Sequence, residues 1–166
     1  MNISKKIHFT FPDPLCRKPK ADYLQYFEDM HRLTKGYLDK EMLIQTIGYS
    51  FPQLIDLAII EDKTLLSVLN KTELCVITHN AYEYDSQYSH LAPYLLEKYN
   101  IKADFLDVIG QGSLECALHV VQAYFDQKKI ATAVILSFTQ RALPLRFDIN
   151  VPLPKYNGVD VMLVNI

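Results

Sequence analysis

Apolar runs separated by polar turns divide this chain into alternating strand-like and helix-like segments. Near-continuous apolar runs are typical of strands that are buried on both faces of a sheet. Such runs occupy residues 74–78, 103–109, 131–138 and 159–166. A shorter β-type run at 7–11 is closed by Pro12. The pattern therefore predicts five strands.

Between these runs, apolar residues recur at three- and four-residue steps and predict helices. Ser50 is expected to cap one of them, with Pro52 in its first turn. The apolar segment LIDLAII inside that helix also fits a strand, and the pattern alone leaves this alternative open. The predicted helices span 21–36, a short segment with Leu38, Met42 and Leu43 ending near Gly48, then 50–70, 89–99 and 113–127.

The alternation of strands and helices predicts an α/β fold with a mixed, five-stranded sheet and helices on both faces. The stretch 139–158 contains prolines and no convincing helix, so we expect a long loop there. A last strand reached without a crossover helix should run antiparallel to its neighbour. We expect residues 1–166 to form a single domain.

The composition of the chain excludes some classes of function. Apolar residues make up 49% and charged residues 22%, with a net charge of −2, so we expect a folded core and no general affinity for nucleic acid or membranes. No targeting or spanning segment is evident, and we expect a cytoplasmic protein. The spacing of Cys16, Cys75 and Cys116 favours reduced thiols, with the last two in the core. The five histidines show no metal-binding spacing, so no metal or cofactor is expected.

The segment DVIGQGSLECALHVVQAYF (107–125) predicts a strand, a glycine turn and a mostly apolar helix. Ser113 could act as a nucleophile at the helix N-terminus, or it could cap the helix. A nucleophilic serine needs a base, and His79 or His90 could supply it through the fold, whereas His119 lies too far along the same helix.

The glycines of this turn also suggest a ligand site at Gly110, Gln111, Gly112 and Ser113. A dinucleotide is disfavoured because Glu115 stands at the third position of the glycine motif and would oppose a pyrophosphate. A glycine turn is also what close packing of a helix on a strand requires.

The order and spacing of five segments resemble the N-terminal half of thiolase-fold condensing enzymes, the ketoacyl synthase group. They are LCVITHN, SHLAPYLLEKYNIKADFLDV, IGQGSLECALHVVQAYFDQKK, TAVILSF and YNGVDVMLVNI. The resemblance extends from about residue 51 onward, and residues 1–50 match more loosely. It implies a half thiolase-like fold.

The same resemblance implies that the family's nucleophilic cysteine is replaced. Gln111 stands at its position, or Gly112 under an alternative alignment. Family members with glutamine there resemble decarboxylating loading synthases, although Gln111 could also merely fit the turn. The family's remaining catalytic groups lie in a second half that this sequence does not include. The resemblance therefore argues against Claisen condensation by this chain.

We thus expect a non-condensing, ketosynthase-like accessory or partner subunit in fatty-acid or polyketide-type biosynthesis. An uncovered apolar face of the helix at 111–123 would be buried in a homodimer, or in a heterodimer with a ketosynthase-like protein, and an acyl-carrier protein is a further expected partner. Tyr82, Tyr84 and Tyr88 form either an interface or a cover for the domain's own core.

Two other functions remain open at this stage. One is a serine-dependent acyltransferase or thioesterase that uses Ser113 on acyl-CoA or acyl-carrier protein. The other is an unrelated α/β domain that binds a small ligand at Gly110–Ser113.

Overall fold

The fold is described from a computed structural model of the chain. The described residues are 1–14, 21–45, 48–79, 90–110, 113–127, 129–146, 148–150 and 152–166. The predicted tyrosine loop with Tyr82, Tyr84 and Tyr88, and Cys16, lie outside them.

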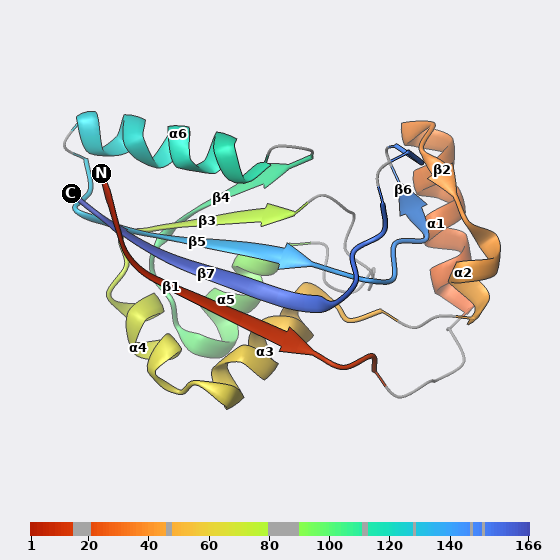
Figure 1. Cartoon of the computed structure of the whole chain (residues 1–166), viewed down its shortest axis with the longest axis horizontal. Helices are drawn as coiled ribbons and strands as arrows, with labels where there is room; N and C mark the ends of the chain where they lie inside the picture. Colours follow the sequence, from red (N-terminus) through yellow and green to blue (C-terminus); the bar gives the residue numbers. More distant parts are fainter. Residues whose placement is uncertain are drawn as a thin grey trace.

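A five-stranded sheet forms the centre of the molecule (Figure 1). Its strands are β1 (Asn2–Phe11), β3 (Leu74–His79), β4 (Asp104–Ile109), β5 (Thr132–Thr139) and β7 (Asn157–Asn165). They lie in the order β1-β7-β5-β3-β4. β3 pairs in parallel with β4 and β5, whereas β7 is antiparallel to both β5 and β1. The predicted mixed sheet and the antiparallel last strand are both confirmed.

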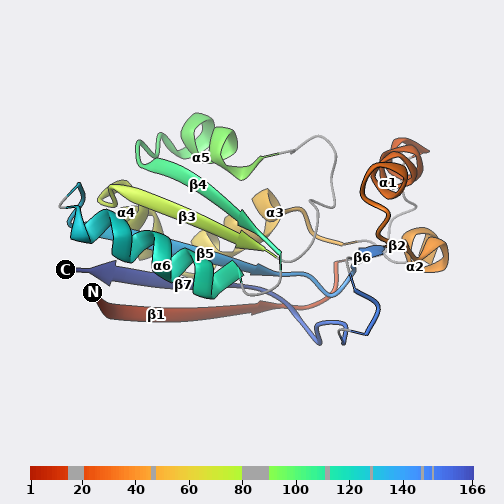
Figure 2. The same cartoon turned by 90° about the horizontal axis from the view of Figure 1, so that it is seen from above.

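Helices cover both faces of this sheet, as predicted (Figures 1 and 2). One face packs against α3 (Phe51–Glu61), α4 (Thr64–Asn70) and α5 (Leu91–Tyr99), and the other packs against α6 (Ser113–Asp126). Each interface has its own hydrophobic cluster, because alternate residues of a strand point to opposite faces. All six residues of β3 are buried, as the apolar run LCVIT predicts for a strand with covered faces.

The segment 50–70 is helical, so the strand alternative for LIDLAII is wrong. Ser50 caps α3 through a capping box, in which its hydroxyl accepts the Gln53 N–H and the Gln53 side chain accepts the Ser50 N–H. The single helix expected up to Asn70 is nevertheless two helices. Asp62 is extended, and its carboxylate accepts the N–H of Thr64, so the chain ends α3 and starts α4 there.

A small lobe lies beyond the carboxyl ends of β3, β4 and β5 (Figures 1 and 2). It contains α1 (Ala21–Thr34), β2 (Tyr37–Leu38), α2 (Lys40–Gln45) and β6 (Leu145–Arg146). β2 and β6 pair as a separate two-stranded sheet, so Leu38 belongs to a strand and not to the expected short helix. The long connection expected at 139–158 includes β6. A small core with Phe27, Leu43 and Leu145 holds this lobe together.

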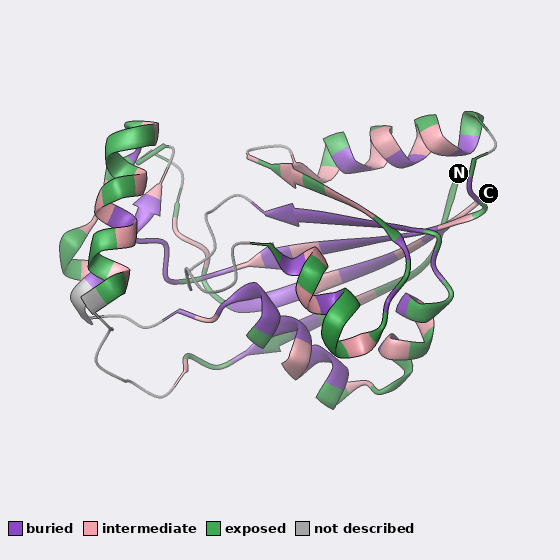
Figure 3. Ribbon diagram, turned by 180° about the vertical axis from the view of Figure 1, so that it is seen from behind, coloured by how far each residue is buried: buried purple, intermediate pink, exposed green. Residues whose placement is uncertain are grey.

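α6 is buried along one stripe only (Figure 3). Ala117, Val121 and Phe125 face the sheet, and Leu114 and Leu118 pack beside them, as the periodicity predicts. Cys116 is exposed instead of buried, because it lies on the outer side of α6 with His119 and Ala123, which are also exposed. Cys75 is in the core, as predicted.

Candidate functional site

The glycine turn predicted as a site lies at the carboxyl edge of the sheet, where β4 ends and α6 begins. Gly110 has a φ of 119°, a conformation that favours glycine because it has no Cβ. Its N–H donates to the carbonyl of His79 at 3.0 Å, and its own carbonyl accepts the N–H of Ser113 at 3.2 Å. These bonds tie the turn to the end of β3. Gln111 and Gly112 lie outside the described residues.

Ser113 is the first residue of α6 and is partly exposed. A capping serine would stand before the first helical residue and accept an N–H with its hydroxyl. Within the described part of the chain, no hydrogen bond involves Ser113 Oγ. Its position is that of a residue in the first turn, where the helix dipole is positive.

The two candidate bases for Ser113 lie on the opposite face of the sheet from α6. His79 follows Cys75 and Ile77 at alternate positions of β3, which place it on the α3 face. There it is buried, with its ring 4.6 Å from that of Phe51. His90 precedes α5, and its Nδ1 lies 3.6 Å from a carboxylate oxygen of Asp107 on the same face. The described structure therefore brings neither histidine onto the face where α6 begins.

The two described cysteines differ in their surroundings. Cys75 is fully buried in the middle of β3, and burial, reinforced by the nearby charge of Asp107, raises the pKa of its thiol. A thiol in such a place stays protonated and does not act as a nucleophile. Cys116 is exposed and lies one turn inside α6.

A row of polar residues, which sequence reasoning missed, crosses four strands on the α6 side of the sheet. Thr78, Ser137, Asp160 and His8 are successive neighbours in the strand register. His8 Nδ1 lies 2.8 Å from Asp160 Oδ1, and within the described chain the buried hydroxyl of Thr78 has no partner. In the neighbouring row of the register, the same face is apolar on three of these strands, with Val76, Ile135 and Met162. This change from an apolar row to a polar row can be recognised in the sequence only once the strand register is known.

Among the residues that the structure describes, no group of three or more His, Cys, Asp or Glu side chains is arranged to hold a metal ion. The same residues contain no helix with the length and apolar character needed to cross a bilayer.

Neither the models of known protein families nor the curated proteins include a match to this chain. Solved structures do match. ChlB3, described as an acyltransferase, aligns with 97% of this chain and 48% of its own at 11% identity and a TM-score of 0.54. The β-ketoacyl-acyl-carrier-protein synthase III of Thermus thermophilus aligns with 100% of this chain and 51% of its own at 10% identity and a TM-score of 0.51.

The chain thus spans about half the length of these structures. At such low identity the likeness concerns the fold, and it agrees with the expected thiolase-like α/β architecture.

Proposed function

We propose that this chain is a non-condensing, ketosynthase-like partner subunit of a fatty-acid or polyketide-type pathway, and that it works as a dimer. The observation that carries the proposal is the uncovered outer side of α6. On this face of the sheet α6 is the one described helix, whereas three helices cover the other face (Figure 2).

The outer side of α6 is suited to contact with another helix. Cys116 and Ala123 are exposed there, two turns apart, and Val120 between them is half-buried. Small side chains allow two helices to approach closely. The polar row from Thr78 to His8 lies on the same face and becomes more exposed toward β1, so it would form the polar margin of the contact.

A second copy of this chain is the partner we favour. The structures that resemble it are about twice as long, and two copies would restore that length. A full-length ketosynthase-like protein could occupy the same face in a heterodimer, and an acyl-carrier protein is a further proposed partner. With glutamine at the position that resembles the family's nucleophile, the role would be structural or chain-positioning.

Analytical ultracentrifugation at micromolar concentration tests the dimer. The unmodified chain should sediment as a dimer, whereas Ala123→Glu should sediment as a monomer with unchanged circular dichroism. Leu96→Glu is the matched control, because Leu96 is a 50%-exposed apolar residue of α5 on the other side of the sheet. This control should remain dimeric.

A monomeric wild type that also forms no complex with a ketosynthase would contradict the proposal. Loss of the dimer in Leu96→Glu but not in Ala123→Glu would place the contact on the α5 side and overturn the assignment to α6. The accessory role itself is tested by adding the chain to a ketosynthase reaction, where a change in product chain length or rate is expected.

A second candidate is a serine-dependent acyltransferase or thioesterase. It is supported by the place of Ser113 in the first turn of α6 and by the description of ChlB3 as an acyltransferase. Intact-protein mass spectrometry after incubation with acyl-CoA or acyl-carrier protein separates the two functions. An acyl adduct that disappears in Ser113→Ala would favour the enzyme, and no adduct is expected for the partner subunit.

A further inference from the structure

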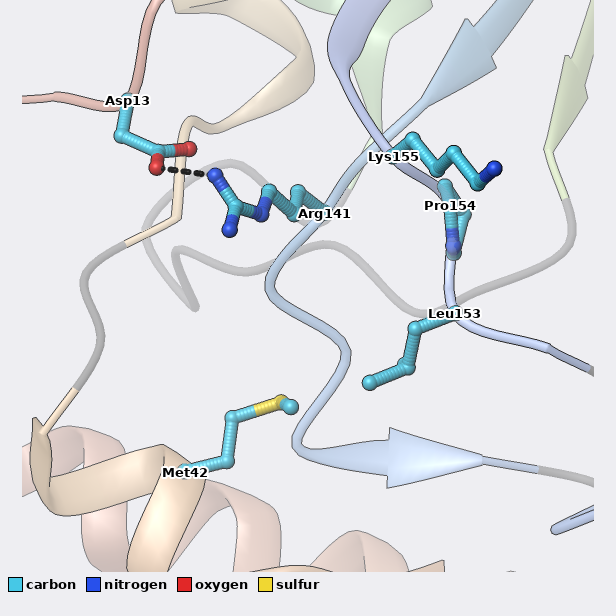
Figure 4. Close-up of a pocket in the computed structure, with 6 residues that line it drawn as sticks. All are labelled: Asp13, Met42, Arg141, Leu153, Pro154 and Lys155. Atoms are coloured by element: carbon cyan, nitrogen blue, oxygen red, sulfur yellow. Dashed lines mark hydrogen bonds and ion pairs between the residues drawn. The ribbon is translucent and has the colours of Figure 1, made fainter.

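A cavity of about 540 Å³ opens where the small lobe meets the end of the central sheet (Figure 4). Arg141 in its wall is already paired with Asp13, and Figure 4 shows the ammonium group of Lys155 pointing away from the Arg141 guanidinium. The charged groups of this cavity therefore do not converge on one ligand. The outer side of α6 differs, because two side chains that bind metal ions are neighbours there.

Cys116 and His119 are three positions apart on α6, and both are exposed (Figure 3). Residues at that spacing are neighbours on the surface of a helix, with Cβ atoms about 5–6 Å apart. Thiolate sulfur and imidazole nitrogen are both common ligands of zinc. A Glu-x-x-His pair at the same spacing supplies two metal ligands from one helix in several helix-bundle proteins. The spacing of the histidines alone does not reveal this pair, because it contains only one of them.

The charge of α6 also favours a cation on this side. Glu115 and Asp126 are exposed, and the helix from Ser113 to Asp126 contains no lysine or arginine. The proposed dimer brings two such helices together and so places carboxylates near carboxylates. A divalent cation at the contact would offset the repulsion between them.

One copy of the chain supplies only half of a zinc site. Structural zinc sites have four protein ligands in a tetrahedron. Among the described residues, no third His, Cys, Asp or Glu side chain is arranged with Cys116 and His119 to hold a metal ion. Across a two-fold axis every contact occurs twice, and two α6 helices related by a perpendicular axis run antiparallel. An axis that passes between Cys116 and His119 would place each of them opposite the other residue of the second copy.

We propose that two copies of this chain bind one zinc ion between their α6 helices, through Cys116 and His119 of each copy. Each thiol releases its proton to the solvent and binds the ion as a thiolate, and each histidine binds as a neutral imidazole. The inference rests on the proposed dimer, and it adds the ion that joins the two copies. Because only the dimer offers four ligands, zinc stabilises the dimer over the monomer.

Zinc titration of the full, untagged and metal-free chain tests the site, with analytical ultracentrifugation at each zinc concentration. The wild type should bind one zinc ion per two chains. Its dimer dissociation constant should fall by about tenfold or more as zinc saturates the site. Cobalt in place of zinc should give the visible absorption of a tetrahedral site together with a thiolate-to-metal charge-transfer band.

Two variants remove the ligands one at a time. Cys116→Ala should abolish both the charge-transfer band and the effect of zinc on the dimer, and His119→Ala should abolish the effect of zinc. Without metal, both variants should dimerise like the metal-free wild type. His90→Ala is the matched control, because His90 is an exposed histidine on the opposite face of the sheet, and it should respond to zinc like the wild type.

The outcomes separate this inference from the proposed dimer. A metal-free wild type that dimerises but takes up no zinc would overturn the zinc site and leave the dimer intact. One ion bound per chain, or equal zinc responses of Cys116→Ala and His90→Ala, would also overturn the shared site. A chain that stays monomeric at every zinc concentration would contradict both the zinc site and the homodimer.

Discussion

Tyr99 donates a 2.7 Å hydrogen bond to Asp56 and so joins the end of α5 to the middle of α3. The other oxygen of the Asp56 carboxylate accepts bonds from Tyr94 Oη and Lys98 Nζ, both at 2.6 Å. Three donors from one helix therefore converge on a single carboxylate of another. This arrangement indicates a structural connection between two helices on the same face of the sheet.

Replacing the acceptor tests how much this connection contributes. Asp56→Ala leaves two partly buried tyrosine hydroxyls and an ammonium without their acceptor, and should lower the free energy of unfolding by about 1–3 kcal/mol. Asp104→Ala is the control, because Asp104 is exposed and its side chain has no hydrogen bond among the described residues, so a change within about 0.5 kcal/mol is expected. Urea unfolding gives both values. Equal changes in the free energy of unfolding for the two variants would mean that the cluster contributes nothing measurable to stability, as is true of many surface ion pairs.

The same cluster predicts a loss of stability in alkali. Burial, and then the bond to Asp56, raise the pKa of Tyr99 to about 12. A group whose pKa is higher in the folded state stabilises the fold below its unfolded pKa, about 10 for tyrosine, and loses this effect as the pH rises toward the folded value. Tyr94 and Lys98 shift in the same direction. The free energy of unfolding should therefore fall from about pH 10 upward.

Tyr99→Phe provides the comparison for this alkaline loss. It removes one of the raised pKa values, so its stability should decline less steeply with pH than that of wild type, as measured by urea unfolding at each pH. Identical slopes for the two proteins would show that Tyr99 titrates alike in the folded and unfolded states.

The sequence pattern predicted the fold correctly where every residue of a segment is buried. The prediction failed where contacts between segments far apart in the sequence determine the structure. The run LCVIT predicts β3 because each of its residues is covered by a helix layer. Leu38, by contrast, becomes a strand residue only because it pairs with Leu145, far away in the sequence. Cys116 was expected in the core because its apolar character does not distinguish the covered side of α6 from the uncovered side, on which it lies.

The candidate sites show the same limit. Gly110 and Ser113 form a turn that the sequence identifies, because the residues that define it are adjacent. Whether His79 or His90 can reach Ser113 depends on the face of the sheet to which each side chain belongs. Both histidines lie on the face covered by α3 and α5, opposite to α6. A cavity lined by Asp13, Arg141 and Lys155 combines residues from separate segments, so no local motif predicts it.

The carboxylate of Glu73 should stabilise the fold at neutral pH and lose this effect in acid. Its carboxylate accepts the N–H groups of Ala131 at 2.7 Å and Thr132 at 3.0 Å, and these bonds hold its pKa below the ordinary value of 4.5. A lowered folded pKa stabilises the fold above the unfolded pKa, and this contribution disappears as the pH falls through the folded value.

Glu73→Gln should therefore weaken the decline in stability as the pH is lowered below about 4.5, measured by urea unfolding across that range. Glu97→Gln, at an exposed position on α5 without a hydrogen bond in the described chain, should leave the decline unchanged. If the two variants behaved alike, the bonds from Ala131 and Thr132 would not favour the ionised form of the Glu73 carboxyl over its protonated form.

Gly158 lies where β7 comes close to the backbone of β1, so a larger residue there has a steric effect. Gly110 provides a comparison in which the effect is conformational. A Cβ at this position would come within 2.2 Å of the carbonyl oxygen of Phe9, so Gly158→Ala should push the paired strands apart and destabilise the protein by about 3 kcal/mol or more. A Cβ at Gly110 meets no atom of the described residues within 4 Å, but the φ of 119° is unfavourable for alanine, so Gly110→Ala should cause a smaller loss of about 1–2 kcal/mol. Thermal unfolding ranks the two variants. Gly158→Ala proving the milder change would show that β1 pairs with β7 in a different register.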